Sequence, residues 1–275
     1  MPPIEYRATL LKVDGVSLTF GENLILRDVR CEVKDIVGRG QVVGLLGPSG
    51  IGKTQFFRIL SGLQQSTAGH VRINATGDPV IIGEIGVVAQ HYPLFEHRKV
   101  FGNLVLAGRL SGLARRDAEA KATGLLAKLE LADRGKFWPR QLSGGQRQRV
   151  AIAQQLMQEG HFLLMDEPFS GLDPEAIDTV CELIAYVAGL DEENTVVVVT
   201  HDIRAAMKVA DQLWLMGLDR NPDGTFVPGA RMQECYNLLE QGLAWSPEVS
   251  QTTAFDDMYH TVRKRFSTLK PKPKR

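Results

Sequence analysis

The chain has 275 residues, 44% of them hydrophobic, and its 32 basic side chains balance 32 acidic ones. This composition is that of a globular protein with room for about two ordinary domains. The balanced charge argues against bulk electrostatic attraction to nucleic acid or to an anionic membrane. The apolar runs stop short of the roughly 20 residues that a membrane-spanning helix needs. Three well-separated cysteines predict neither a zinc site nor a disulfide framework.

Apolar strands and amphipathic helices follow one another along most of the chain. Alternating or β-branched segments predict strands within residues 10–20, 24–33, 41–46, 70–74, 85–89, 161–166, 195–200 and 212–217. Apolar residues at helical spacing predict helices at 53–63, over much of 99–135, at 174–188 and from 202 onwards. From residue 220, a turn-rich link leads into two weak helical segments and a basic, proline-interrupted tail, LKPKPKR.

This alternation of strands and helices predicts a largely parallel sheet that is covered by helices on both faces. The helical block from 99 to 135 interrupts the alternation. We therefore expect this block to be a subdomain that is inserted into an α/β domain.

The glycine-rich stretch GPSGIGKT stands between a predicted strand and a predicted helix and fits the pattern G-x-x-x-x-G-K-[ST]. Its glycines let backbone N–H groups converge on a phosphate, and the start of the helix adds its positive end. Lys53 supplies a positive charge for the outer phosphates, and the hydroxyl of Thr54 suits Mg²⁺. A plain glycine-rich turn is the other interpretation. The favoured one is a site for a nucleoside triphosphate, made of Gly47, Pro48, Ser49, Gly50, Ile51, Gly52, Lys53 and Thr54.

Two carboxylates end the apolar strand FLLMD, where Asp166 is followed by Glu167 and then by Pro168. Because side chains alternate along a strand, the two carboxylates point in different directions and can do different work. Asp166 can hold Mg²⁺ through water, while Glu167 can face the terminal phosphate and polarise an attacking water. Acids at a strand end are often only solvated. Here the proline leaves both at the carboxyl edge of the sheet, where ligands of such sheets bind.

The stretch LSGGQRQRV, residues 142–150, predicts a second anion site. Ser143, Gly144 and Gly145 open a helix, so that a hydroxyl and bare backbone N–H groups lie at its positive end. One chain thus carries two phosphate-binding elements for one chemistry, and two copies that face head to tail would bring both to the same nucleotide. An ordinary serine N-cap followed by a flexible glycine pair is the alternative for this stretch alone.

Together, GPSGIGKT, a lone Gln90 at a strand end, LSGGQ, LLMDEP, SGLD and THD resemble the ATP-binding cassette (ABC) ATPases in order and rough spacing. The resemblance covers residues 9–217. It implies an α/β P-loop ATPase core with a mainly parallel sheet, an N-terminal antiparallel β subdomain and an α-helical subdomain inserted at about 91–140. Residues 218–275 are then a C-terminal extension with the basic tail. Within the family, PFSGLDP is similar to importers of the nitrate, taurine and aliphatic-sulfonate group.

The resemblance also implies roles for single residues. Phe20 takes the place of an aromatic that stacks on adenine, although a phenylalanine in a strand can equally belong to the core. Gln90 is similar to the glutamine that reaches the metal and the attacking water, and His201 to the histidine that contacts the γ-phosphate. Asp173 resembles the acid that crosses the dimer interface, and Gln146 completes the signature stretch that contacts ATP.

The cofactors that the resemblance implies are ATP and Mg²⁺, with the metal held by Thr54, Gln90 and Asp166. The implied partners are a second ATPase subunit, most simply a second copy of the chain, and integral membrane permease subunits. An extracytoplasmic solute-binding protein is an indirect partner, and no nucleic acid is expected. The implied location is the cytoplasmic face of a bacterial inner membrane. The resemblance further implies that closing of the pair on ATP drives the membrane subunits and that hydrolysis at Glu167 reopens the pair.

Other functions fit the sequence less well. An ABC ATPase of DNA repair needs a long coiled coil between the phosphate loop and LSGGQ, and a ribosome-associated one needs two cassettes, whereas the sequence holds one copy of each motif. A non-enzymatic binding module is disfavoured by Glu167 and His201. The ATPase subunit of an exporter or a lipid transporter is the closest alternative, because the cassette itself scarcely differs.

Overall fold

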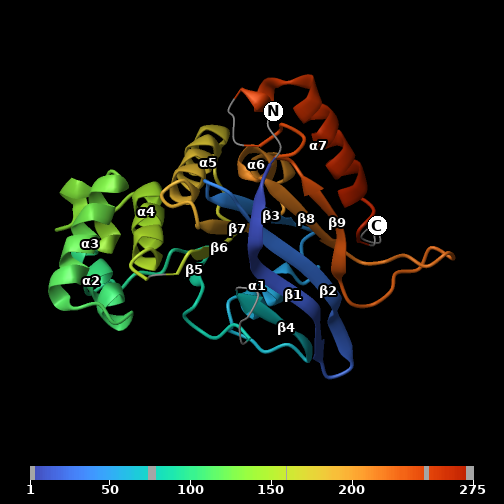
Figure 1. Cartoon of the computed structure of the whole chain (residues 1–275), viewed down its shortest axis with the longest axis horizontal. Helices are drawn as coiled ribbons and strands as arrows, with labels where there is room; N and C mark the ends of the chain where they lie inside the picture. Colours follow the sequence, from blue (N-terminus) through green and yellow to red (C-terminus); the bar gives the residue numbers. More distant parts are fainter. Residues whose placement is uncertain (1–3, 74–78, 159, 245–247, 271–275) are drawn as a thin grey trace. The chain divides into compact units, whose positions relative to one another are not determined.

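The computed structural model describes residues 4–73, 79–158, 160–244 and 248–270, so most of the predicted basic tail, residues 271–275, lies outside the described residues. The chain forms two compact units, one of residues 1–85 and 164–275 and the other of residues 86–163. Figure 1 labels the helices and strands of both. Among the described residues, no helix combines the length and the apolar character that crossing a bilayer requires.

The first strands of the chain form an antiparallel sheet in the first unit. In spatial order they are β2 (Asn23–Ile36), β1 (Tyr6–Phe20) and β4 (Ala68–Ile73). The β1–β2 hairpin closes with Phe20 opposite Asn23, and Gly21 takes a positive φ of 58° in the two-residue turn between them. Every second or third side chain of β1 from Leu11 to Leu18 is buried, so one face of this sheet joins the core. The expected N-terminal antiparallel sheet is confirmed.

A second sheet is mostly parallel. In spatial order its strands include β6 (Phe162–Asp166), β7 (Thr195–Thr200), β3 (Gln41–Leu46), β8 (Gln212–Gly217) and β9 (Arg231–Asn237). β3 runs parallel to β7 and to β8, and every residue of β3 and β7 is buried. Continuously apolar strands are typical of a parallel sheet that is covered on both faces. The predicted α/β fold class is therefore confirmed.

Three helices of the first unit follow these strands: α1 (Lys53–Leu60), α5 (Pro174–Ala188) and α6 (Ile203–Val209). α5 has the predicted bounds because its sequence carries its own start signal. The Asp173 carboxylate accepts a hydrogen bond from the backbone N–H of Ala176 at 2.9 Å, and Pro174 occupies the first helical position. The buried residues Val180, Leu183, Ile184 and Val187 recur at helical spacing and form its core-facing stripe.

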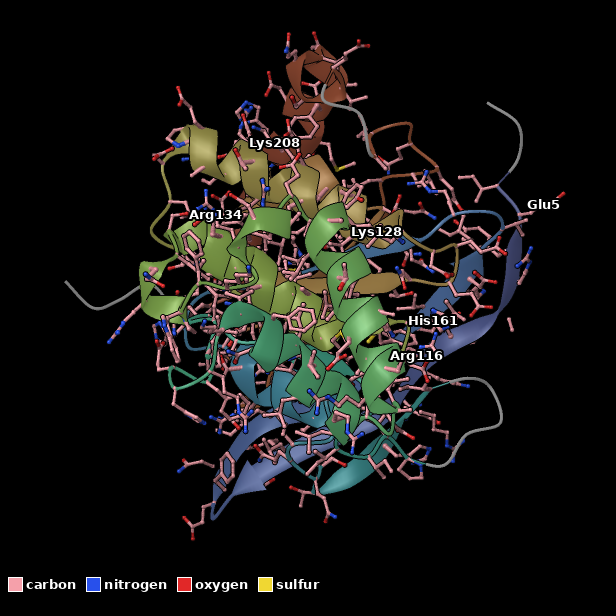
Figure 2. All side chains as sticks on the ribbon, turned by 90° about the vertical axis from the view of Figure 1, so that its left-hand side faces the viewer. Glu5, Arg116, Lys128, Arg134, His161 and Lys208 are labelled. Atoms are coloured by element: carbon pink, nitrogen blue, oxygen red, sulfur yellow. The ribbon has the colours of Figure 1, made fainter. Side chains whose placement is uncertain are left out.

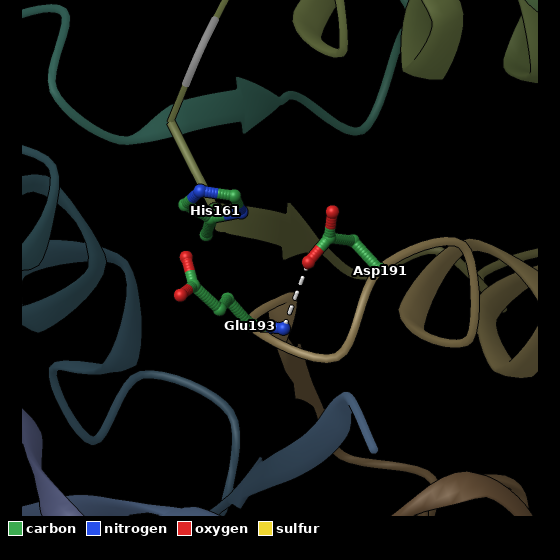
Figure 3. A group of neighbouring side chains, drawn as sticks. All are labelled: His161, Asp191 and Glu193. Atoms are coloured by element: carbon green, nitrogen blue, oxygen red, sulfur yellow. Dashed lines mark hydrogen bonds between the residues drawn. The ribbon is translucent and has the colours of Figure 1, made fainter. Parts of the chain in front are cut away.

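The connection between α5 and β7 is a short turn that is closed by side chains. The Asp191 carboxylate accepts a hydrogen bond from the backbone N–H of Glu193 at 3.0 Å (Figure 3). The Asn194 side chain donates to the carbonyl of Val187, also at 3.0 Å. Side chains of this kind stabilise a turn by pairing backbone groups that the turn leaves open. β7 can therefore begin at Thr195, directly after the turn.

The region after β8 contains one element that the sequence analysis assigned wrongly. The first of the two predicted helical segments is instead β9, which pairs antiparallel with β8 from Gln212 opposite Asn237 to Gly217 opposite Arg231. The second is helical, as α7 (Thr253–Phe266) preceded by a short 3-10 turn, η3 (Val249–Gln251). β9 lacks β-branched residues, so its conformation comes from the open hydrogen-bonding edge of β8 and not from local propensity.

The second unit is mainly helical, as the sequence predicted. Its elements are β5 (Gly86–Val88), α2 (Val100–Leu110), α3 (Arg115–Lys128), η1 (Ala132–Arg134), η2 (Pro139–Gln141) and α4 (Gly144–Gln155). Buried Asn103 of α2 accepts from the N–H of Phe95 at 2.8 Å, and its amide donates to the carbonyls of Phe95, Arg98 and Lys99. This one side chain ties the segment before α2 to the helix. Figure 2 shows Arg116 and Lys128 near the two ends of α3, where both are exposed.

Candidate functional site

The glycine-rich loop connects the buried strand β3 to helix α1 in the first unit. Gly50 and Gly52 have φ values of +76° and +111°, a range that side chains disfavour, so glycine is strongly favoured at both positions. Gly52 is the N-cap of α1, and within the described part of the chain no side-chain hydrogen bond caps this helix. The first N–H groups of α1 therefore remain available to an anion.

The Lys53 side chain folds back over this loop. It is only 8% exposed, its ammonium donates to the carbonyl of Gly47 at 2.8 Å, and it lies 3.9 Å from the Glu167 carboxylate. Burial lowers the pKa of Lys53, while the negative charges of Glu167 and Asp166 oppose this shift. The Lys53 ammonium thus lies between the backbone of the loop and the Glu167 carboxylate, which follows β6. Thr54, the next residue, is exposed.

Glu167 stands directly after β6 in a conformation that is rare for its type. Its φ is +47°, which for a residue other than glycine costs on the order of 1–3 kcal/mol, and its backbone N–H pairs with the carbonyl of Val199 at 2.8 Å. The carboxylate accepts a hydrogen bond from the Thr200 hydroxyl at 3.0 Å, and both of its oxygens lie 3.0 Å from Nδ1 of His201. The strained backbone and these two partners fix the direction of one carboxylate.

Thr200 is a site residue that the sequence analysis did not identify. It is the last residue of β7 and is 1% exposed. Its hydroxyl donates to Glu167 and accepts a hydrogen bond from the N–H of Asp202 at 3.1 Å. The sequence offered one signal for this role, a threonine that ends an apolar strand and precedes His201. A buried hydroxyl at that place needs hydrogen-bond partners, which here are Glu167 and Asp202.

Asp166 is the half-buried neighbour of Glu167. Burial and, to a smaller extent, the charge of Glu167 raise the pKa of Asp166, while Lys53 and Arg58 oppose this shift. Among the described residues no hydrogen bond to the Asp166 carboxylate is present. Two adjacent carboxylates that are partly withdrawn from water favour a cation between or beside them, and carboxylate and hydroxyl oxygens are the ligands that Mg²⁺ prefers. Asp166 and Thr54 therefore fit a magnesium ion.

The remaining predicted residues of the first unit lie as follows. The Phe20 ring ends β1 and is 49% exposed, so it is not a core side chain. His201 is exposed, and its ring contacts Glu167 as described. Asp173 caps α5 through the N–H of Ala176, so in the single chain its carboxylate serves its own helix.

The second unit holds the other predicted elements. Ser143 is the N-cap of α4: its hydroxyl accepts from the N–H of Gln146 at 3.3 Å, and the Gln146 side chain accepts from the N–H of Ser143 at 3.1 Å. This reciprocal pair is a capping box. Gly144 and Gly145 are exposed and would have open space around a Cβ atom, so the backbone of this helix start is bare. Gln90 is exposed, shortly after β5.

Comparison with known proteins identifies the family. Residues 32–170 match the family model described as ABC transporter. The chain belongs to the ABC transporter family. As a member of it, the chain is an ATP-binding ATPase.

Curated relatives include the sulfate/thiosulfate import ATP-binding protein CysA of Escherichia coli strain K12, which is 39% identical over 217 residues. The alignment covers 75% of this chain and 57% of that protein. CysA of Synechococcus elongatus is 38% identical over 215 residues, covering 76% of this chain and 60% of the relative. The chain thus accounts for less than two thirds of the length of these ABC relatives.

Two solved structures show the same fold. CbiO1 of Clostridium perfringens, described as part of the ABC transporter complex cbiONQ, superposes with a TM-score of 0.73 at 22% identity, over 94% of this chain and all of that one. The ATP-binding cassette MJ0796, solved as a dimer in a post-hydrolysis state with ADP and phosphate, gives a TM-score of 0.66 at 26% identity. It covers 83% of this chain and 99% of its own. The ABC ATPase fold is shared across most of the chain.

Proposed function

We propose that this ABC ATPase is the ATP-hydrolysing subunit of an importer of a small solute. The observation that carries the catalytic part is the Glu167 carboxylate, which Thr200 and His201 hold beside the Lys53 ammonium. The names of the curated relatives support import, and they point to small sulfur oxyanions. The sequence resemblance to nitrate, taurine and sulfonate importers points to solutes of the same general kind.

In this proposal the chain's own residues do the following work. Backbone N–H groups of the phosphate loop and the Lys53 ammonium hold the ATP phosphates. Glu167 orients an attacking water and takes up its proton, and His201 donates to the terminal phosphate. A magnesium ion held by Asp166 and Thr54 would supply charge neutralisation at the phosphates. Phe20, whose ring is exposed, would stack on the adenine.

In this proposal the elements of the second unit act on ATP that is bound by a second copy of the chain. The bare start of α4 at Ser143, Gly144 and Gly145 is suited to an anion, and we assign it to ATP held by a second copy of the chain. Asp173 would then reach across the same interface, and Gln90 would report on the nucleotide. The dimeric neighbour of known structure supports this arrangement by its fold. The predicted division into a cassette at 9–217 and an extension at 218–275 remains part of this proposal.

Coupling to membrane subunits has a candidate surface in the second unit. A cavity of about 710 Å³ lies among the start of α2, the last turns of α3 and residues 132–136. Phe101, Leu126 and Ala127 give it apolar walls, and its charged lining residues are Lys99, Lys136 and Asp133. A cavity of this size and character would accept a short helix of a permease at the cytoplasmic face of the membrane. The solute itself would be selected by the permease and a solute-binding protein.

The rival function is that of an exporter ATPase, and the direction of transport separates the two. The chain is captured from detergent-solubilised membranes, and the complex with its copurifying membrane proteins is reconstituted in vesicles. Labelled sulfate, thiosulfate, nitrate and taurine are then offered with the solute-binding protein. For an importer, solute accumulates on the side that holds ATP, and the Glu167→Gln complex accumulates none. Movement away from the ATP side would establish an exporter and overturn the proposal.

A further inference from the structure

The last described residues of the chain return to the phosphate loop. Lys270 is exposed, and its ammonium donates a hydrogen bond to the backbone carbonyl of Ser49. The same ammonium lies 3.8 Å from the position that a Cβ atom on Gly50 would occupy. Ser49 and Gly50 form the exposed first turn of the loop, where the backbone must adopt a positive φ at glycine. A cation from the far end of the chain therefore rests on the turn that shapes the loop.

The position of Lys270 is fixed by the residue before it. Leu269 is 1% exposed, and its carbonyl accepts a hydrogen bond from the N–H of Leu218 at 3.0 Å. A Cβ atom on Gly217 would come within 2.6 Å of Leu269, so the glycine that ends β8 permits this approach. The same strand pairs with β3, which leads directly into the phosphate loop. The neighbouring strands β3 and β8 therefore position the phosphate loop and the segment around Leu269, respectively.

Helix α7 anchors the segment from the other direction. Its residues Phe255 and Val262 are buried in the cluster that also contains Leu269. Arg265 donates to Glu234 of β9 at 2.6 Å and to Gln233 at 3.3 Å. Lys270 therefore comes after a packed helix and directly after a buried leucine. The fold of the C-terminal extension thereby brings Lys270 to the loop.

The charge of Lys270 acts on the nucleotide site as well. Its ammonium and that of Lys53 repel each other, because both carry a positive charge. Asp166 and Glu167 are the negative groups that offset this repulsion around Lys53. A bound polyphosphate relieves the repulsion further, so the second cation also favours an occupied loop.

We propose that Lys270 is a positioning residue that holds the Ser49–Gly50 turn in the shape that accepts phosphate. The C-terminal extension, through this contact, then sets the affinity of the chain for nucleotides. Loss of one charged hydrogen bond at an exposed loop corresponds to about a three- to tenfold weaker nucleotide affinity. The contact involves the Ser49 carbonyl and not the Glu167 carboxylate, so we expect the rate constant of hydrolysis to depend little on it. The inference needs only nucleotide binding and does not depend on the direction of transport.

The test compares three variants of the full chain. Lys270→Met removes the ammonium, Lys270→Arg keeps a cationic donor, and Lys264→Met is the matched control, since Lys264 is an exposed lysine on α7. Calorimetric titration gives Kd for ATP and for ADP, and steady-state ATPase assays give KM and kcat. We expect Lys270→Met to raise Kd for both nucleotides and KM for ATP about three- to tenfold, with kcat within about twofold of wild type. Lys270→Arg should restore most of the affinity, and Lys264→Met should match wild type.

Other outcomes overturn the inference. Equal Kd values for Lys270→Met and Lys264→Met would show that the contact has no effect beyond net charge. A loss confined to ATP would show direct contact with the terminal phosphate in place of loop positioning. A lower kcat at unchanged KM would also contradict it. Thermal unfolding of each variant accompanies the titrations, and failure of Lys270→Arg to restore affinity in a folded protein would reject the hydrogen-bonding role.

Discussion

Replacement of Glu167 by glutamine tests the centre of the proposed chemistry. The amide keeps the size of the side chain and one acceptor for the Thr200 hydroxyl, but it cannot take a proton from water. Removal of a general base typically costs a hundred- to ten-thousandfold in rate, which is about 3 to 5 kcal/mol of barrier. We therefore expect kcat for ATP hydrolysis to fall by that factor, measured by phosphate release under saturating ATP.

The same substitution should leave nucleotide binding intact or make it stronger. Glu167 lies 3.9 Å from the Lys53 ammonium, a separation at which opposite charges attract by about 4 kcal/mol for an effective dielectric constant of about 20. Glutamine removes this competitor for Lys53 and one negative charge beside the phosphates. Asp166→Asn, the matched change, should weaken MgATP binding and rate together, because it removes a proposed metal ligand. Equal losses of affinity in both variants would refute the assignment of Glu167 as base.

Three further predictions concern neighbouring groups. Lys53→Ala should abolish detectable ATP binding while the circular dichroism spectrum stays that of wild type; normal affinity in the folded variant would remove the phosphate-loop assignment. In the Glu167→Gln background, ATP should induce dimers in sedimentation at high protein concentration, and Ser143→Arg should abolish them; dimers that persist in the Ser143→Arg variant would place the start of α4 outside the interface. Thr200→Val should lower kcat about tenfold by removing the donor to Glu167, about 1.4 kcal/mol, whereas Thr200→Ser should stay near wild type; equal rates for the two variants would deny the hydroxyl a role.

The sequence predicts those elements whose signals are local. α5 begins at Pro174 because Asp173 caps it, and both signals stand next to the helix that they start. The strands β3 and β7 are so uniformly apolar that a buried parallel sheet is the arrangement that satisfies them. The phosphate loop is predictable for the same reason, since its glycines lie between such a strand and α1.

The geometry around Glu167 is beyond local reasoning. The residue type does not predict a φ of +47°, because glutamate avoids this region of backbone conformation unless its surroundings impose it. The surroundings here are the Val199 carbonyl and the Thr200 hydroxyl, which the chain brings back after the whole of α5. The sequence could therefore name the carboxylate, but its orientation and its partner Thr200 depend on β7.

The C-terminal extension shows the same limit in its secondary structure. The segment from Arg231 to Asn237 has no strong preference of its own and becomes a strand because β8 offers an unpaired edge. β9 then supplies Glu234, to which Arg265 of α7 binds, and the ordered helix carries Leu269 onto Gly217. Each step depends on the one before it, and together they bring a residue near the end of the chain to a loop some two hundred residues earlier. A composition that is typical of a solvated tail thus includes a lysine that contacts the glycine-rich loop.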